Sequence, residues 1–228
     1  MHKILLFDID GTLLQIKQHV IRGLIGELVQ RYTPDVSLDE LAKIPFAGRT
    51  DRAIFEDLLK IGQQPVSLFN ELKQHYIESL QARLTADDIL LYEPVFRVLE
   101  YCSSQNIPMG LLTGNFREIA VLKTRITGIG EYFKFGAFGC DHPRRQALPE
   151  IARQSASDYL GVPVEPEQLI LIGDTPNDIK AARYGNSRAV AVSTGTYSYN
   201  QLSQHKPDLL LNDMSRPETW IQQLLDWN

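Results

Sequence analysis

The chain has 228 residues, of which 43% are hydrophobic, and a net charge of −5. A chain of this length can bury a full core, as one large domain or as a domain with an insert. The 23 Lys and Arg residues do not outnumber the 28 Asp and Glu residues. We therefore expect no nucleic-acid partner. No stretch approaches the ~20 apolar residues of a membrane span, so we expect a cytoplasmic protein without a membrane partner.

The first element is a short apolar run that ends in two carboxylates. Lys3 to Phe7 has the length and composition of a strand buried on both faces, and Asp8, Asp10 and Gly11 follow it. Like charges repel, and each loses hydration in less aqueous surroundings, so this arrangement calls for a cation.

The next segment has helical spacing. From Gln15 to Arg31, apolar residues recur at the interval of one helix face, and further helices are expected up to Arg83. Ser37 with Glu40 forms the pattern of a capping box. We found no convincing strand between Ile16 and Arg83, which predicts a helical insert over residues 15–87.

Beyond Asp87 the pattern alternates between helices and strands. Strands are expected at 108–112, 133–138, 169–172, 189–192 and 208–211, with helices between most of them. Alternating units of this kind predict an α/β fold with a Rossmann-like parallel sheet and helices on both faces. The core domain would comprise residues 1–14 and 88–228.

Three of the predicted strands end in polar residues of the same kinds. They lead into Asp8-Ile9-Asp10-Gly11-Thr12, Thr113-Gly114-Asn115, and Gly173-Asp174-Thr175-Pro176-Asn177-Asp178. In a parallel sheet these ends meet at one edge, where ligands bind. Carboxylate oxygens favour Mg²⁺, and Thr113 with the N–H groups that open the next helix can hold phosphate oxygens. The pattern indicates a metal and phosphate site.

These motifs resemble those of the haloacid dehalogenase superfamily of phosphohydrolases. The sequence Asp8-Ile9-Asp10-Gly11-Thr12-Leu13 matches the family's D-x-D-G-T-[LV] motif, and Gly173-Asp174-Thr175-x-x-Asp178 matches G-D-[ST]-x-x-D. The resemblance spans the whole chain, because residues 15–87 lie where the family carries its α-helical C1 cap domain. Within the family, the chain looks like the phosphoglycolate phosphatase and β-phosphoglucomutase branch.

The resemblance implies roles for individual residues. Asp8 would be the nucleophile that forms an aspartyl-phosphate, and Asp10 the general acid and base. Mg²⁺ would be held by Asp8, the backbone carbonyl of Asp10, and Asp174, with Asp178 in direct or water-mediated support. The expected substrate-binding residues are Gly11, Thr12, Gly114 and Asn115, and Thr113 is an expected catalytic residue.

The third motif departs from the family pattern. The family usually shows a lysine followed by proline, whereas this chain has Pro143-Arg144-Arg145-Gln146 before Ala147-Leu148-Pro149. We expect Arg145 to supply the positive charge beside Asp8, with Arg144 as its rival. Within the cap, Arg49 follows Gly48 in a loop where C1 caps place substrate-selecting residues, so it is a candidate anion contact.

Together these features predict a Mg²⁺-dependent phosphatase that acts on a small phosphorylated metabolite through a covalent aspartyl-phosphate. The alternatives are a phosphomutase of the β-phosphoglucomutase type and a non-catalytic relative that binds phosphate. The sequence does not identify the substrate. We expect a monomer, because a C1 cap already covers the site.

Overall fold

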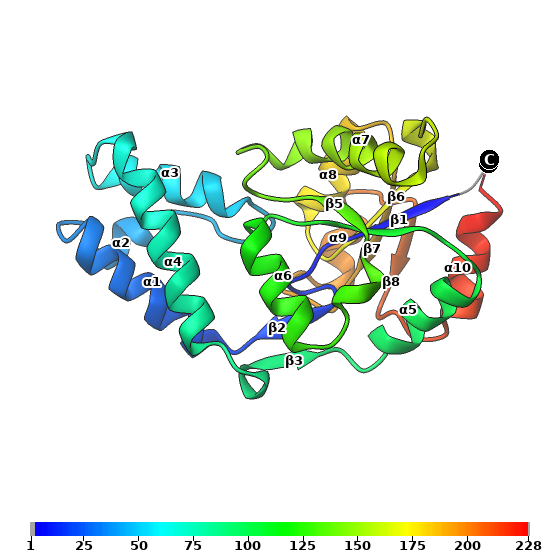
Figure 1. Ribbon diagram of the computed structural model, residues 1–228, viewed down its shortest axis with the longest axis horizontal. Helices are drawn as coiled ribbons and strands as arrows, with labels where there is room; N and C mark the ends of the chain where they lie inside the picture. Colours follow the sequence, from blue (N-terminus) through cyan, green and yellow to red (C-terminus); the bar gives the residue numbers. More distant parts are fainter. Residues whose placement is uncertain (1–2, 228) are drawn as a thin grey trace.

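A computed structural model describes residues 3–227, and its main feature is a six-stranded parallel sheet (Figure 1). The strand order is β5-β4-β1-β6-β7-β8, and all the paired neighbours are parallel. The strands are β1 (Ile4–Phe7), β4 (Met109–Leu112), β5 (Phe135–Ala137), β6 (Leu169–Gly173), β7 (Arg188–Val192) and β8 (Leu209–Leu211). The predicted α/β fold class is confirmed.

Helices cover both faces of this sheet because successive side chains of a strand point to opposite sides. Leu5 and Phe7 pack in one apolar cluster with α5, α6 and α10, while Ile4 and Leu6 pack in a second with α7, α8 and α9. These helices are α5 (Val95–Ser104), α6 (Arg117–Ile126), α7 (Leu148–Leu160), α8 (Pro176–Tyr184), α9 (Tyr199–Ser203) and α10 (Pro217–Leu225). Strand β1 is therefore buried on both sides, which brings Asp8 directly after it into a buried position.

The segment between β1 and α5 forms the left part of Figure 1. Its helices are α1 (Gln18–Tyr32), α2 (Leu38–Leu41), α3 (Asp51–Ile61) and α4 (Phe69–Arg83). Two short strands, β2 (Leu14–Ile16) and β3 (Ile89–Leu91), pair antiparallel at its base. The division into a core and a cap over residues 15–87 stays a prediction, and we call α1–α4 the cap helices. No helix in the described chain combines the length and apolar character of a membrane span.

The chain also contains short 3₁₀ helices. They are η1 (Val66–Leu68), η2 (Ala86–Asp88), η3 (Gly130–Tyr132), η4 (Arg145–Ala147) and η5 (Pro166–Gln168).

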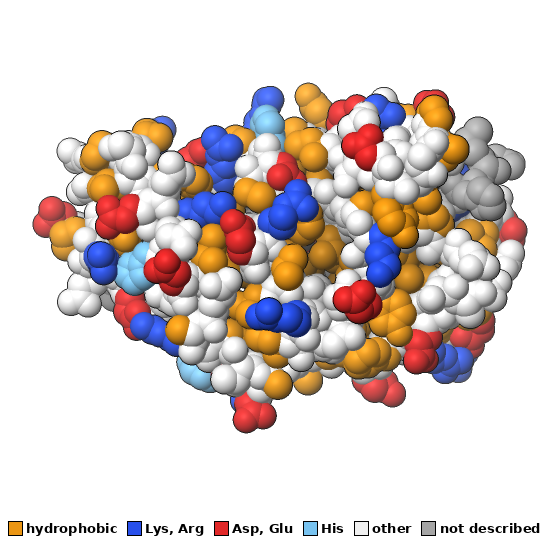
Figure 2. Space-filling view, in the orientation of Figure 1, with side chains coloured by type: hydrophobic (Ala, Val, Ile, Leu, Met, Phe, Trp, Pro, Cys, Tyr) orange, Lys and Arg blue, Asp and Glu red, His pale blue; other side chains and the backbone are white. Residues whose placement is uncertain are grey.

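On the face drawn in Figure 2, basic and acidic side chains intermix over the surface rather than forming one large basic patch.

The predicted helix from Gln15 to Arg31 begins too early. Leu14 and Ile16 are buried and Gln15 between them is exposed, which is the alternation of a strand. Strand β2 pairs with β3, and α1 starts only at Gln18. The error arose because Ile16 also fits the helical spacing of the apolar residues that follow it, and three residues are too few to reveal a two-residue period.

Candidate active site

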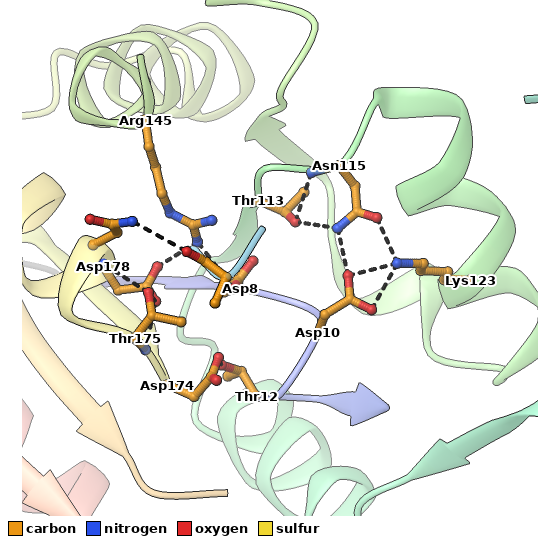
Figure 3. A network of polar contacts seen from close by, with 12 residues as sticks. Asp8, Asp10, Thr12, Thr113, Asn115, Lys123, Arg145, Asp174, Thr175 and Asp178 are labelled. Carbon is orange, nitrogen blue, oxygen red and sulfur yellow. Dashed lines mark hydrogen bonds and ion pairs between the residues drawn. The ribbon is translucent and has the colours of Figure 1, made fainter. Parts of the chain in front are cut away.

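The site is built from the carboxyl ends of the three central strands. Asp8 follows β1, Thr113 follows β4 and Asp174 follows β6. Because β4, β1 and β6 are adjacent and parallel, these ends meet at one edge of the sheet (Figure 3). The fold thus brings together residues that are far apart in the sequence.

Three carboxylates form a buried cluster at this edge. Asp8, Asp174 and Asp178 each offer an oxygen within 4.8 Å of the others, and the three residues are only 3–5% exposed. Asp178 lies in the first turn of α8, where its Oδ2 accepts hydrogen bonds from the N–H and hydroxyl of Thr175. The side chain of Asp10 is not part of this cluster. For Asp10, only the backbone carbonyl oxygen was predicted to bind a metal.

Arg145 lies against the cluster. Its Nη2 is 3.1 Å from Asp8 Oδ2 and also contacts Asp178 Oδ1. Burial alone would lower the pKa of Arg145, but the carboxylates of Asp178 and Asp8 raise it, so the guanidinium stays charged. Arg144, the alternative candidate for this role, is exposed, and the backbone N–H of Arg144 donates to His142 Nδ1. The geometry therefore places Arg145 beside the predicted nucleophile.

The electrostatics of the cluster favour an additional cation. Burial raises the pKa of Asp8 to about 6, although Arg145 acts in the opposite direction. Burial, and then the charges of Asp178 and Asp8, raise the pKa of Asp174 to about 8. One guanidinium thus faces three carboxylates, and Asp174 holds a proton at neutral pH unless another positive charge replaces it. A compact set of hard carboxylate oxygens suits a divalent cation such as Mg²⁺.

Gly11 and Thr12 lie against Asp174. Gly11 has a φ of +82°, and a Cβ at this position would collide with the carboxylate of Asp174. Thr12 is fully buried and donates a hydrogen bond to Asp174 Oδ1 at 3.2 Å. The structure thus places Thr12, predicted to bind substrate, behind a carboxylate of the cluster. Gly11 does line the cavity described below.

Asp10 belongs to a second network that the sequence reasoning did not foresee. Lys123 Nζ lies 2.8 and 2.6 Å from the two carboxylate oxygens of Asp10, and 2.6 Å from Asn115 Oδ1. Asn115 Nδ2 donates to Asp10 Oδ2 at 2.7 Å and to Thr113 Oγ1 at 2.9 Å. Figure 3 shows this network beside the acidic cluster.

Lys123 is only 3% exposed, which is unusual for a lysine. It follows Ile119 by four residues and so lies on the apolar face of α6. A single lysine within an apolar helix face was the signal that could have identified it.

The loop before α3 contacts the loop after β4. The N–H of Asp51 donates to the carbonyl of Gly114 at 2.7 Å, and Asp51 Oδ2 accepts from the N–H of Phe116 at 2.9 Å. A Cβ on Gly114 would collide with the carbonyl of Arg49. Gly114, predicted to bind substrate, therefore also gives the cap loop room to approach the site.

The guanidinium of Arg49 is engaged within its own segment. Its Nη2 is 2.7 Å from Asp57 Oδ2 and donates to the carbonyl of Ala53 at 3.3 Å. Arg49 lines the cavity next to the acidic cluster, but the described contacts do not bring it to the cluster itself. Its predicted role as an anion contact stays a prediction.

A cavity of about 660 Å³ connects the acidic cluster with the cap helices. Asp8, Asp10, Asp174, Arg145 and Lys123 line the core side, and residues of α1, α3 and α4 line the opposite side. A volume of this size lies within the roughly 300–1,000 Å³ range of small-molecule sites.

The buried Asp51 predicts a pH-dependent stability. Burial raises the pKa of Asp51 from 3.8 to about 7, and Lys123 only partly offsets this effect. The folded protein therefore holds a proton at Asp51 between about pH 4 and 7, where the unfolded chain has lost it, so stability falls as the pH rises through this range and the full cost of the buried charge is reached above about pH 7. Asp51→Asn removes this charge and keeps an acceptor oxygen for Phe116. We expect it to raise the free energy of unfolding by about 1 kcal/mol at about pH 8, and by less at about pH 5.

Urea unfolding of both proteins at the two pH values measures this difference. Asp39→Asn on the exposed part of α2 is the matched control and should change stability equally at both. A gain for Asp51→Asn that is larger at the lower pH would contradict the prediction.

Comparison with known proteins identifies the family. The family model for haloacid dehalogenase-like hydrolases matches residues 2–186. A Listeria welshimeri protein named pyrophosphatase PpaX is 24% identical over 215 residues, which cover 92% of each chain.

Solved structures are similar over nearly the whole chain. A predicted phosphoglycolate phosphatase from Haemophilus somnus has 22% identity and a TM-score of 0.71, covering 97% of this chain and 98% of its own. A β-phosphoglucomutase from Clostridium difficile also has 22% identity and a TM-score of 0.71, covering 99% and 97%. The match of the family model over most of the chain confirms the predicted resemblance: the chain belongs to the haloacid dehalogenase-like hydrolases.

Proposed function

We propose that this protein is a Mg²⁺-dependent phosphatase that hydrolyses a small organic phosphomonoester through an aspartyl-phosphate on Asp8. The observation that carries the proposal is the position of Asp8. It is buried, it contacts Arg145, and it shares a cluster with two further carboxylates. Asp8, Asp174, Asp178 and the backbone carbonyl of Asp10 would hold the Mg²⁺. When bound, the ion would offset the negative charge of the phosphoryl group.

Asp8 Oδ2 faces the guanidinium of Arg145, which fixes the carboxylate in one orientation. An Asp8 oxygen attacks phosphorus, and the bond to the leaving oxygen breaks. Water then attacks the phosphorus of the aspartyl-phosphate, releases inorganic phosphate and restores Asp8. Arg145 stabilises negative charge in both steps because it is buried and stays protonated.

Asp10 would carry the proton. It donates to the leaving oxygen in the first step and accepts a proton from the attacking water in the second. In this structure both of its carboxylate oxygens accept hydrogen bonds from Lys123, and Oδ2 also accepts one from Asn115. Delivery of a proton to substrate therefore requires Asp10 to loosen these contacts.

Thr113 would donate a hydrogen bond to a phosphoryl oxygen. Its hydroxyl accepts hydrogen bonds from the backbone N–H and the side-chain Nδ2 of Asn115. No described residue accepts the hydroxyl proton of Thr113, so it is available for a ligand. The buried Nε of Arg145 likewise has no hydrogen-bond partner among residues 3–227, which favours an anionic ligand beside it.

Asp8→Asn should abolish turnover. Asparagine keeps the shape of the side chain but removes the nucleophilic carboxylate, so we expect kcat for an aryl phosphate to fall about 10³-fold or more. Phosphate release in the presence of Mg²⁺ measures this effect, and circular dichroism checks the fold. Activity that survives in a folded variant would exclude Asp8 as the nucleophile.

Asp10→Asn should impair chemistry more than metal binding, because Asp10 contributes its backbone carbonyl, and not its side chain, to the proposed ion site. We expect kcat to fall about 10²–10⁴-fold and the Kd for Mg²⁺, measured by calorimetry, to change by less than about tenfold. The opposite order of effects would place the Asp10 side chain on the metal.

The two neighbouring arginines form a matched pair for a test of the third motif. Arg145→Met should lower kcat about 10²–10³-fold, because it removes the only cation in contact with Asp8 among the described residues. Arg144→Met should leave kcat within about twofold, since Arg144 is exposed. Arg145→Lys keeps a positive charge in the cluster, so it is the control for a loss of activity that comes from unfolding rather than from the missing cation. Equal losses in the two Met variants would contradict the assignment.

A further inference from the structure

The cavity wall opposite the acidic cluster is mainly apolar. The cap helices and the loop before α3 supply it. Its apolar members are Ile21, Ile25, Phe46, Ala47, Ile54 and Phe55, and its polar members, besides Tyr76, are Gln18, Arg22, Arg49 and Asp51. Phe46, a large apolar residue that lines the cavity, is 39% exposed. Apolar lining with few polar groups is typical of sites for organic molecules.

The cavity offers little positive charge to a second phosphoryl group. Arg145 and Lys123 are paired with carboxylates of the site, and Arg49 is paired with Asp57. Of the cationic residues that line the cavity in the described chain, only Arg22 has no ion pair, and it is exposed. A pyrophosphate whose first phosphoryl group occupied the acidic site would thus place its second one against an apolar wall with one solvated cation.

One tyrosine of this wall has a hydroxyl that is not bonded to the described protein. Tyr76 lines the cavity and is only 6% exposed, and its ring packs edge-on against Phe55 and Phe116, with centroids 5.1 and 6.3 Å away. Its hydroxyl makes no hydrogen bond to any described residue and is not fully buried, so it is accessible to a ligand in the cavity. Burial, with the charges of Asp51 and Asp10, raises the pKa of Tyr76 well above 10, so the hydroxyl keeps its proton.

We infer that the leaving group of the substrate is a small organic alcohol or phenol, with apolar surface against the cap helices and one oxygen that hydrogen-bonds Tyr76. The inference rests on the proposed phosphatase function and narrows its substrate class. An organic leaving group would also distinguish the substrate of this chain from the pyrophosphate for which some of its relatives are named. Tyr76 becomes a specificity-determining residue that lies outside the loop containing Arg49.

The test compares inorganic pyrophosphate, phenyl phosphate and the three hydroxyphenyl phosphates as substrates. The three isomers place one hydroxyl at different points around the ring and have leaving groups of similar acidity. We expect kcat/KM for phenyl phosphate to exceed that for pyrophosphate by about tenfold or more. At least one hydroxyphenyl phosphate should be better still. In Tyr76→Phe, the ratio of kcat/KM for that isomer to kcat/KM for phenyl phosphate should fall about five- to tenfold.

Tyr184→Phe is the matched control, because Tyr184 is 70% exposed and lies at the end of α8. It should leave every ratio unchanged. Faster cleavage of pyrophosphate than of every aryl phosphate would overturn the inferred substrate class while supporting a phosphatase. An unchanged ratio in Tyr76→Phe would overturn the role of Tyr76. Hydrolysis of none of the five compounds would overturn the proposed function itself.

Discussion

The central constraint in this structure is the burial of three carboxylates around one guanidinium. Asp8, Asp174 and Asp178 share a space in which Arg145 is the only described cation in contact with them. The sheet creates this situation, because helices cover both of its faces and its central strands end side by side. Burial raises the pKa of Asp8 and Asp174, so the cluster holds either protons or another cation. A bound divalent cation would let Asp174 stay ionised at neutral pH.

The same edge of the sheet also determines how the cap helices meet the core. Gly114 permits the loop before α3 to approach, and Asp51 then bonds both the carbonyl of Gly114 and the N–H of Phe116. The loop that would hold phosphate and the wall that would hold the leaving group are therefore joined by direct hydrogen bonds. Phe116 extends this link, since its ring packs against Phe55 and Tyr76 in the cavity wall. Changes in the cap should thus alter the chemistry as well as the choice of substrate.

Much of the core could be predicted from the sequence, because an apolar strand that ends in acidic residues can be recognised from a short stretch of sequence. Parallel topology then brings Asp8 and Asp174 together without any knowledge of side-chain contacts. The proline alignment puts Gln146 at the position of the family's lysine, and Arg145 was inferred one residue before it because its long side chain can bridge that offset. The partners of Lys123 and Tyr76 could not be predicted, since each residue matters through tertiary contacts that helical spacing does not encode. The short strand β2 was missed because its three residues are too few to show a two-residue period and because its partner β3 is distant in the sequence.

In the proposed mechanism, the phosphoryl group is transferred to Asp8 before it is transferred to water. Each of the two transfers inverts the configuration at phosphorus, so the complete reaction should retain it. The most direct measurement is the stereochemical course of hydrolysis of an aryl phosphorothioate that is made chiral with oxygen isotopes and cleaved in isotopically labelled water. The covalent mechanism predicts inorganic thiophosphate with retained configuration at phosphorus. Inversion would show that water attacks the substrate directly and would contradict the covalent role of Asp8.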